Sequence, residues 1–146
     1  MTYRCGSSRA ATQSQGSAEA AVARILIAED EEPVRTLVTR ALTEEGHVVV
    51  VATDGAEALD TLQSQGGGFE LLLADIKMPV MDGIALALAV ARDFPKLPIL
   101  LMTGYADQRE RAHGLQLLIH DVITKPFTLA AIRDAVKGAL TARKMH

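Results

Sequence analysis

Residues 69–83 read FELLLADIKMPVMDG, and this stretch decides how we expect the chain to fold. Its first part, Phe69 to Ala74, is an apolar run of the length typical of a strand buried on both faces. Asp75 follows directly, and the segment Met78 to Gly83 has the proline and glycine of a loop. An alanine- and leucine-rich segment to about Asp93 predicts a helix. The stretch therefore predicts a strand, a loop and a helix, with a carboxylate where the strand ends.

The same alternation of strand and helix runs through the chain from Arg24 onward. Apolar runs predict further strands at 25–28, 48–51, 98–102 and around 122–123. Apolar side chains at helical spacing predict helices over Val34 to Leu42, Gly55 to Ser64, Asp107 to Leu117 and Leu129 to Leu140. Five such units predict an α/β fold with a doubly wound, five-stranded parallel sheet, (βα)5, covered by helices on both faces.

Composition limits what kind of protein this is. The chain has 146 residues, 49% of them apolar, a formal net charge of -3 and a pI near 5.8, which fits one globular domain without a basic surface for direct nucleic-acid binding. The single cysteine, Cys5, excludes a disulfide framework, and no apolar run is long enough for a membrane helix, so we expect a cytoplasmic protein. Residues 1–22 are small and polar and are expected to form a flexible leader before one domain at 23–146, with no output module after it.

Polar side chains follow four of the predicted strands. Glu29 and Asp30 follow the first, Asp75 the third, Thr103 the fourth and Lys125 the fifth. Because parallel strands end at one edge, three carboxylates, a hydroxyl and an ammonium should meet there. Two carboxylates about 4 Å apart repel by roughly 4 kcal/mol at an effective dielectric near 20, and hard oxygen ligands favour Mg²⁺ as the relieving cation. Such a site can transfer a phosphoryl group to a carboxylate, although the pattern alone does not say which one.

These motifs resemble the receiver domains of bacterial two-component response regulators, which have a flavodoxin-like fold. The resemblance runs from about Arg24 to Arg143 and depends on the acidic pair, the Asp-x-x-Met-Pro-x-Met-Asp-Gly loop, Thr103-Gly104 and Lys-Pro-Phe at 125–127. Taken singly, each acid could be a loop or first-turn residue and the lysine a solvated one. Their joint placement at the ends of four strands favours the site.

The resemblance implies a role for each of these residues. Asp75 would accept a phosphoryl group from a histidine kinase or a histidine phosphotransfer protein. Asp30 and Asp75 would bind Mg²⁺ directly, Glu29 mainly through water, and Lys77 through its backbone carbonyl. Lys125 and the Thr103 hydroxyl would contact the phosphoryl oxygens, and Lys125–Pro126 is where receivers carry a cis peptide bond. The protein would be a phosphoryl acceptor and not a turnover enzyme.

Two positions depart from the family pattern. Receivers usually have an aromatic switch residue three positions before the lysine, and this chain has Val122 there. We hypothesise that Tyr105, two residues after Thr103, takes over as the movable ring. Lys77, two residues after the acceptor, could crowd or polarise the site, so the lifetime of the phosphoryl group does not follow from the resemblance.

The resemblance further implies a stand-alone receiver that signals through the surface running from Thr103 through Lys125 to the last helix, by changing its affinity for a downstream protein. The main alternative is a pseudo-receiver that binds proteins without being phosphorylated, since Val122 weakens the usual switch. A haloacid dehalogenase-type phosphatase is disfavoured because Lys77 stands where that family needs a second acid. A flavodoxin-like flavin site is disfavoured because the loop at 29–32, Glu-Asp-Glu-Glu, would repel a phosphate.

Overall fold

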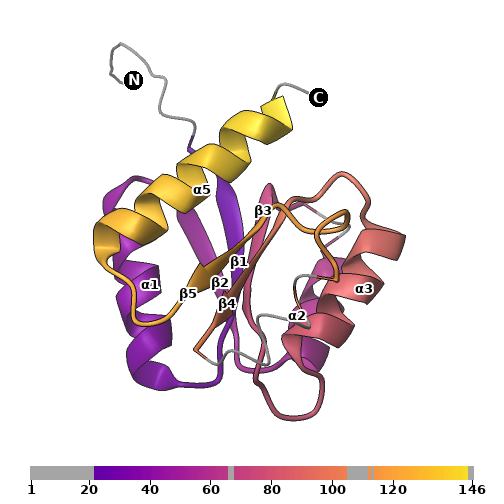
Figure 1. The fold of residues 1–146 in the computed structure, drawn as a ribbon. Helices are drawn as coiled ribbons and strands as arrows, with labels where there is room; N and C mark the ends of the chain where they lie inside the picture. Colours follow the sequence, from indigo (N-terminus) through magenta and orange to yellow (C-terminus); the bar gives the residue numbers. More distant parts are fainter. Residues whose placement is uncertain (1–21, 66–67, 105–111, 113, 145–146) are drawn as a thin grey trace.

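A five-stranded parallel sheet forms the centre of the computed structural model, which describes residues 22–65, 68–104, 112 and 114–144 (Figure 1). Its strand order is β2-β1-β3-β4-β5, and every neighbouring pair is parallel. The strands are β1 (Arg24–Ala28), β2 (Val48–Ala52), β3 (Leu71–Asp75), β4 (Ile99–Thr103) and β5 (Asp121–Thr124). The prediction of a doubly wound, five-stranded parallel sheet is confirmed.

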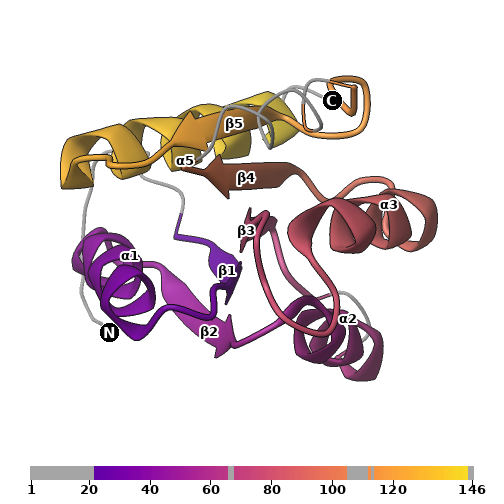
Figure 2. The same ribbon diagram turned by 60° about the horizontal axis from the view of Figure 1, so that its bottom comes forward.

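Helices cover both faces of the sheet. On one face lie α1 (Glu32–Glu44) and α5 (Leu129–Lys144), and on the other lie α2 (Gly55–Ser64) and α3 (Gly83–Asp93), as Figures 1 and 2 show from two sides. Pro33 stands in the first turn of α1, where its missing N–H costs nothing, and Gly46 follows the helix at a φ of 90°. Within the described residues, no helix is both long enough and apolar enough to cross a membrane.

The sheet separates two apolar cores. Alternate residues of β1 face opposite sides, so Leu26 packs with α2 and α3 while Ile25 and Ile27 pack with α1 and α5. All five residues of β3 and of β4 are buried, which is why both strands read as continuous apolar runs. The edge strand β2 is more open, with Val48 54% and Val51 44% exposed. The central strands β1, β3 and β4 are therefore the most rigidly packed ones.

Strand ends differ by one or two residues from those predicted. β3 begins at Leu71 instead of Phe69. At Glu70 the side chain, and not a backbone carbonyl, accepts the hydrogen bond from β1. Its carboxylate accepts from the Arg24 N–H at 2.5 Å, and its own N–H donates to the Arg24 carbonyl at 2.8 Å. At the other end Asp75 belongs to β3, which sets the direction of its side chain by the pleat of the strand.

The helix predicted over 107–117 falls largely on residues outside the described part of the chain. Its predicted end is wrong, because residues 114–118 form turns. The Leu118 N–H donates to the carbonyl of Leu115 at 2.7 Å, three residues back, which is the spacing of a turn and not of an α-helix. Gly114, a poor helix residue, begins this segment. The turns leave Leu117 95% exposed.

Candidate functional site

The five residues predicted to form a site lie at the carboxyl edge of the sheet. Glu29 and Asp30 follow β1, Asp75 ends β3, Thr103 ends β4 and Lys125 follows β5. The register aligns the last residues of neighbouring strands, so these side chains start from nearly the same height along the sheet. The fold therefore gathers residues that are separated by almost a hundred positions in the sequence.

Three carboxylates form a compact acidic cluster. One oxygen each from Glu29, Asp30 and Asp75 lies within 4.8 Å of the other two. Glu29 is fully buried and Asp75 is 4% exposed, whereas Asp30 faces solvent. A set of hard oxygen ligands with one open side fits Mg²⁺, which keeps several of its waters. The residues present therefore fit the cation that the sequence predicts.

Lys125 lies among the carboxylates. Its Nζ is 3.2 Å from Oε1 of Glu29, 3.3 Å from Oδ1 of Asp75 and 3.5 Å from Oε1 of Glu31. The Lys125 N–H donates to the Thr103 carbonyl at 2.7 Å, and the Lys125–Pro126 peptide bond is cis, as the resemblance implies. The ammonium therefore offsets part of the negative charge of the site.

Burial changes the ionisation of these groups. Loss of water around the Glu29 carboxylate raises its pKa from 4.5 to about 7, with the charge of Asp75 adding to the rise and the Glu31 N–H and Lys125 opposing it. Burial also raises the pKa of Asp75, against the pull of Lys125. Desolvation works against the ammonium, but the carboxylates of Asp75 and Glu29 outweigh it and raise the pKa of Lys125. The site therefore resists full ionisation of its acids unless further positive charge is present.

The loop after β3 is held by close backbone packing. The Gly83 N–H donates to the carbonyl of Ile76 at 2.8 Å, and a Cβ at Gly83 would lie only 2.2 Å from the Asp75 carbonyl oxygen. Asp82 caps α3 by accepting from the Ala85 N–H at 2.9 Å. Only glycine fits at position 83, and the backbone of Asp75 is positioned as a result.

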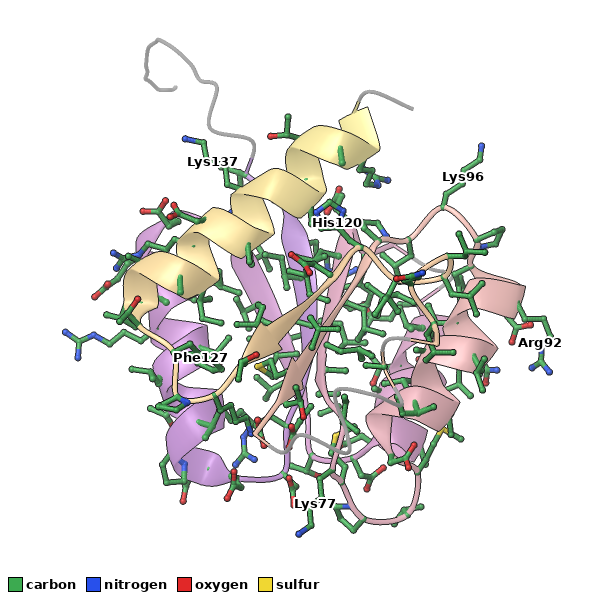
Figure 3. The ribbon with its side chains drawn as sticks, viewed as in Figure 1. Lys77, Arg92, Lys96, His120, Phe127 and Lys137 are labelled. Atoms are coloured by element: carbon green, nitrogen blue, oxygen red, sulfur yellow. The ribbon has the colours of Figure 1, made fainter. Side chains whose placement is uncertain are left out.

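A groove of about 650 Å³ opens over the cluster. One part is polar and is lined by Asp30, Asp75 and Lys77, the last of which marks this edge of the sheet at the bottom of Figure 3. The other part is apolar and runs between α1 and the segment after β5, along Leu37 and Phe127. The groove can hold a phosphoryl group at its polar end and an apolar surface of a donor beside it.

The structure describes two of the three predicted switch residues. Thr103 is fully buried at the end of β4. Val122 is half-buried in β5, where it packs against the core beneath α2 and α3, and it does not line the groove. Tyr105 lies outside the described residues, so its proposed movement stays a hypothesis.

Two contacts of this site were missed in the sequence. Glu31 reaches Lys125, and the Arg35 guanidinium donates to the backbone carbonyls of Glu29 at 2.9 Å and Asp30 at 3.4 Å. The run of four acids at 29–32 was a visible signal for Glu31. Arg35 gave no comparable signal, because its reach depends on how α1 leaves the loop.

Comparison with known proteins decides the family. The family model for the response regulator receiver domain matches residues 25–137, which is most of the chain. The chain belongs to this family. The match spans the strand ends that carry the acidic cluster, Thr103 and Lys125, and it confirms the resemblance deduced from the motifs.

Individual relatives agree with this assignment. The receiver domain is 36% identical over 106 residues to the transcriptional regulatory protein TcrA of Mycobacterium tuberculosis, covering 73% of this chain and 41% of that protein. It is 32% identical over 117 residues to the alkaline phosphatase synthesis transcriptional regulatory protein PhoP of Bacillus subtilis, covering 80% and 48%. The chain thus spans less than half the length of these two relatives.

A solved structure supports the same assignment. The response regulator TrrA of Thermotoga maritima, determined in complex with Mg²⁺-BeF, is 30% identical, with a TM-score of 0.72 over 80% of this chain and 98% of that one. Receiver domains bind Mg²⁺ in an acidic pocket, and this chain has an acidic cluster of Glu29, Asp30 and Asp75 at the corresponding edge of its sheet.

Proposed function

We propose that this receiver domain accepts a phosphoryl group on Asp75 in a Mg²⁺-dependent reaction. The observation that supports this most directly is the contact of Asp75 with both the acidic cluster and Lys125, at one end of a groove that is open to solvent. A carboxylate in that position can be approached by a donor, and Lys125 offsets part of its negative charge.

The chemistry follows from these groups. An oxygen of Asp75 attacks the phosphorus of a phosphohistidine, the bond from phosphorus to the imidazole nitrogen breaks, and an acyl phosphate forms. The imidazole nitrogen leaves with the bonding pair. Lys125 binds an oxygen of the incoming group as a point charge, and the Thr103 hydroxyl donates to another. Asp30, Asp75 and the carbonyl of Lys77 would hold Mg²⁺ directly and Glu29 mainly through water, and the bound cation would supply positive charge to the phosphoryl oxygens.

The partners we propose are a histidine kinase or a histidine phosphotransfer protein as donor and a downstream protein as target, all in the cytoplasm. Phosphorylation would shift a two-state equilibrium in the surface formed by β4, β5, α5 and the segment between the two strands, and so change affinity for the target. Movement of Tyr105 is part of this proposal. We further propose that the receiver unit is 23–146 and that residues 1–22 are an extension that it does not need.

The rival function is a pseudo-receiver that binds its target without phosphorylation. The half-buried aliphatic Val122 at the usual aromatic position favours it. Every group needed for phosphoryl transfer is nevertheless present in the proposed site, so we put phosphorylation first.

Intact mass spectrometry after incubation with acetyl phosphate and Mg²⁺ decides between the two functions. We expect wild type to gain one phosphoryl group, about 80 Da, and Asp75→Asn to gain none. Asp82→Asn is the matched control, since asparagine keeps the helix cap and the acid lies in the same loop. An unmodified wild type, under conditions that label an established receiver, would establish the pseudo-receiver.

A further inference from the structure

A second groove lies at the end of the sheet opposite the acidic cluster. It measures about 700 Å³ and is formed by the segment before β4, the segment before β5 and the last turns of α5. His120 and Lys96 mark this end near the top of Figure 3, far from Lys77 at the bottom. The phosphoryl-transfer site uses none of these residues.

The floor of this second groove is apolar and firmly packed. Ile119 is 8% exposed, Leu97 is 9% exposed and Ala139 is fully buried. Beside them, Leu117 is 95% and Leu118 44% exposed, so apolar surface continues from the floor out onto the rim. Such a continuous exposed apolar surface is a feature of binding sites, whereas single exposed leucines are common.

The rim of the groove carries hydrogen-bond donors with positive charge. Lys96 lines it from the segment before β4 and Arg143 from the last turn of α5. Among its described lining residues there is no carboxylate. The chain as a whole has more acids than bases, so the positive charge of this rim is opposite in sign to the net charge of the protein. A partner must therefore bring both apolar side chains and carboxylates.

The imidazole of His120 lies against α5 at a glycine. Gly138 stands inside the helix, where glycine costs about 1 kcal/mol relative to alanine, and the His120 Nε2 is 4.0 Å from the position of its missing Cβ. The His120 N–H donates to the carbonyl of Ile99 at 2.7 Å, which holds the residue beside the start of β4. The rim of the groove is thus built from ordered backbone at this point.

Candidate occupants differ in charge. Residues 1–21 contain Arg4 and Arg9 against a single acid, Glu19, so this segment of the chain has the wrong sign. A second copy docked groove to groove would bring Lys96 and Arg143 against the same cations of its partner. A nucleic acid has the right sign but offers phosphates to an apolar floor, where they would lose their hydration.

We propose that this groove binds an acidic peptide segment of a partner protein, anchored by apolar side chains on the floor and by carboxylates at Lys96 and Arg143. The groove is separate from the acidic cluster, although it shares α5 and the segment before β5 with the surface that we propose responds to phosphorylation, and binding does not require a phosphorylated Asp75. The groove would let the domain hold a protein without depending on the phosphoryl group.

Peptide selection tests the proposal. The unphosphorylated full chain would be panned against a random-peptide display library, and enriched peptides would be titrated into ¹⁵N-labelled protein. We expect sequences with acids around two or more apolar residues, and chemical-shift changes at Ile119, His120 and Ala139. Lys96→Glu with Arg143→Glu should weaken binding about tenfold or more, because two attractions become repulsions.

Matched variants separate the groove from general surface effects. Arg92→Glu removes an exposed cation from α3, and Leu88→Ser removes an exposed leucine from the same helix, so neither should change the affinity. Leu117→Ser should weaken it. Selection of basic peptides, no enrichment at all, or shifts confined to the acidic cluster would overturn the proposal. Stronger groove shifts with a single-stranded oligonucleotide, or a dimer abolished by Lys96→Glu, would replace the peptide by that occupant.

Discussion

The Nζ of Lys125 lies 3.2 Å from Oε1 of Glu29, a carboxylate with no exposed surface. The ammonium itself is mostly buried, with 18% of the side chain exposed, and it is within 3.3 Å of Asp75 as well. One cation therefore serves two acids that have little water. This arrangement links the stability of the domain to the charges of its site.

Removing this ammonium should destabilise the fold. With Lys125→Met we expect a loss of about 2 kcal/mol or more in the free energy of unfolding, because two buried carboxylates lose their counter-charge. The loss should be smaller at acid pH, where the carboxylates take up protons. Urea unfolding monitored by circular dichroism measures it. The control Lys137→Met, at an exposed position of α5, should stay within about 0.5 kcal/mol of wild type.

The raised pKa of Glu29 predicts how stability depends on pH. Between 4.5 and about 7 the folded state holds a proton on Glu29 that the unfolded state has released, so this residue lowers stability as the pH rises through that range. The full effect is at most about 3 kcal/mol, at 1.36 kcal/mol per pKa unit. In Mg²⁺-free buffer, Glu29→Gln should therefore be more stable than wild type above the range and lose that advantage below it. Equal pH profiles for the two proteins would show that Glu29 has an ordinary pKa.

Bound Mg²⁺ should offset the loss of stability that comes from ionising the buried Glu29. A cation bound only by the folded state adds about 2.7 kcal/mol to the free energy of unfolding at one hundred times its Kd. We expect a smaller gain at acid pH, because Glu29 and Asp75 must lose their protons to bind it. Thermal unfolding with increasing MgCl₂ tests this, and Asp75→Asn should abolish most of the shift. Asp54→Asn, at the cap of α2, should retain it.

Two glycines should respond in opposite ways to the same change. At Gly83 an added Cβ would lie 2.2 Å from the carbonyl oxygen of Asp75, so Gly83→Ala should destabilise by several kcal/mol or prevent folding. At Gly138 the nearest heavy atom outside the helix backbone is 4.0 Å away, and Gly138→Ala should stabilise by about 0.5–1 kcal/mol through helix propensity. Denaturant midpoints of the two variants give the comparison. A destabilised Gly138→Ala would mean that His120 packs more tightly than the structure has it.

Val80 is strained in the loop after β3. It has a φ of 69°, which a β-branched residue rarely adopts, and it is 85% exposed, so little packing offsets the strain. Val80→Gly should raise the free energy of unfolding by about 1 kcal/mol, and Val80→Ile should leave it nearly unchanged. If phosphorylation by acetyl phosphate is unaltered in Val80→Gly, the valine is not needed for the chemistry.

The parts of this molecule that follow from local pattern were predictable. β3, the loop after it and the acids at strand ends could be read because a buried parallel strand is an apolar run and its end is marked by polarity. Contacts that depend on the angle at which one element leaves another could not be predicted from the sequence. Arg35 meets the carbonyls of Glu29 and Asp30 only because of how α1 starts. The turns at 114–118 stand where the weak apolar pattern predicted the end of a helix.

The start of α2 is also joined to the loop that follows β3. The Gly55 N–H donates to the carbonyl of Met81 at 3.0 Å, and a Cβ on Gly55 would lie 2.4 Å from that same oxygen. These two segments therefore have to be exchanged together in any engineered variant, although 26 positions separate Gly55 from Met81 in the sequence. A chimaera that imports the Asp75–Gly83 loop from another receiver should import Thr53–Gly55 with it, since either part alone would meet a partner of the wrong shape.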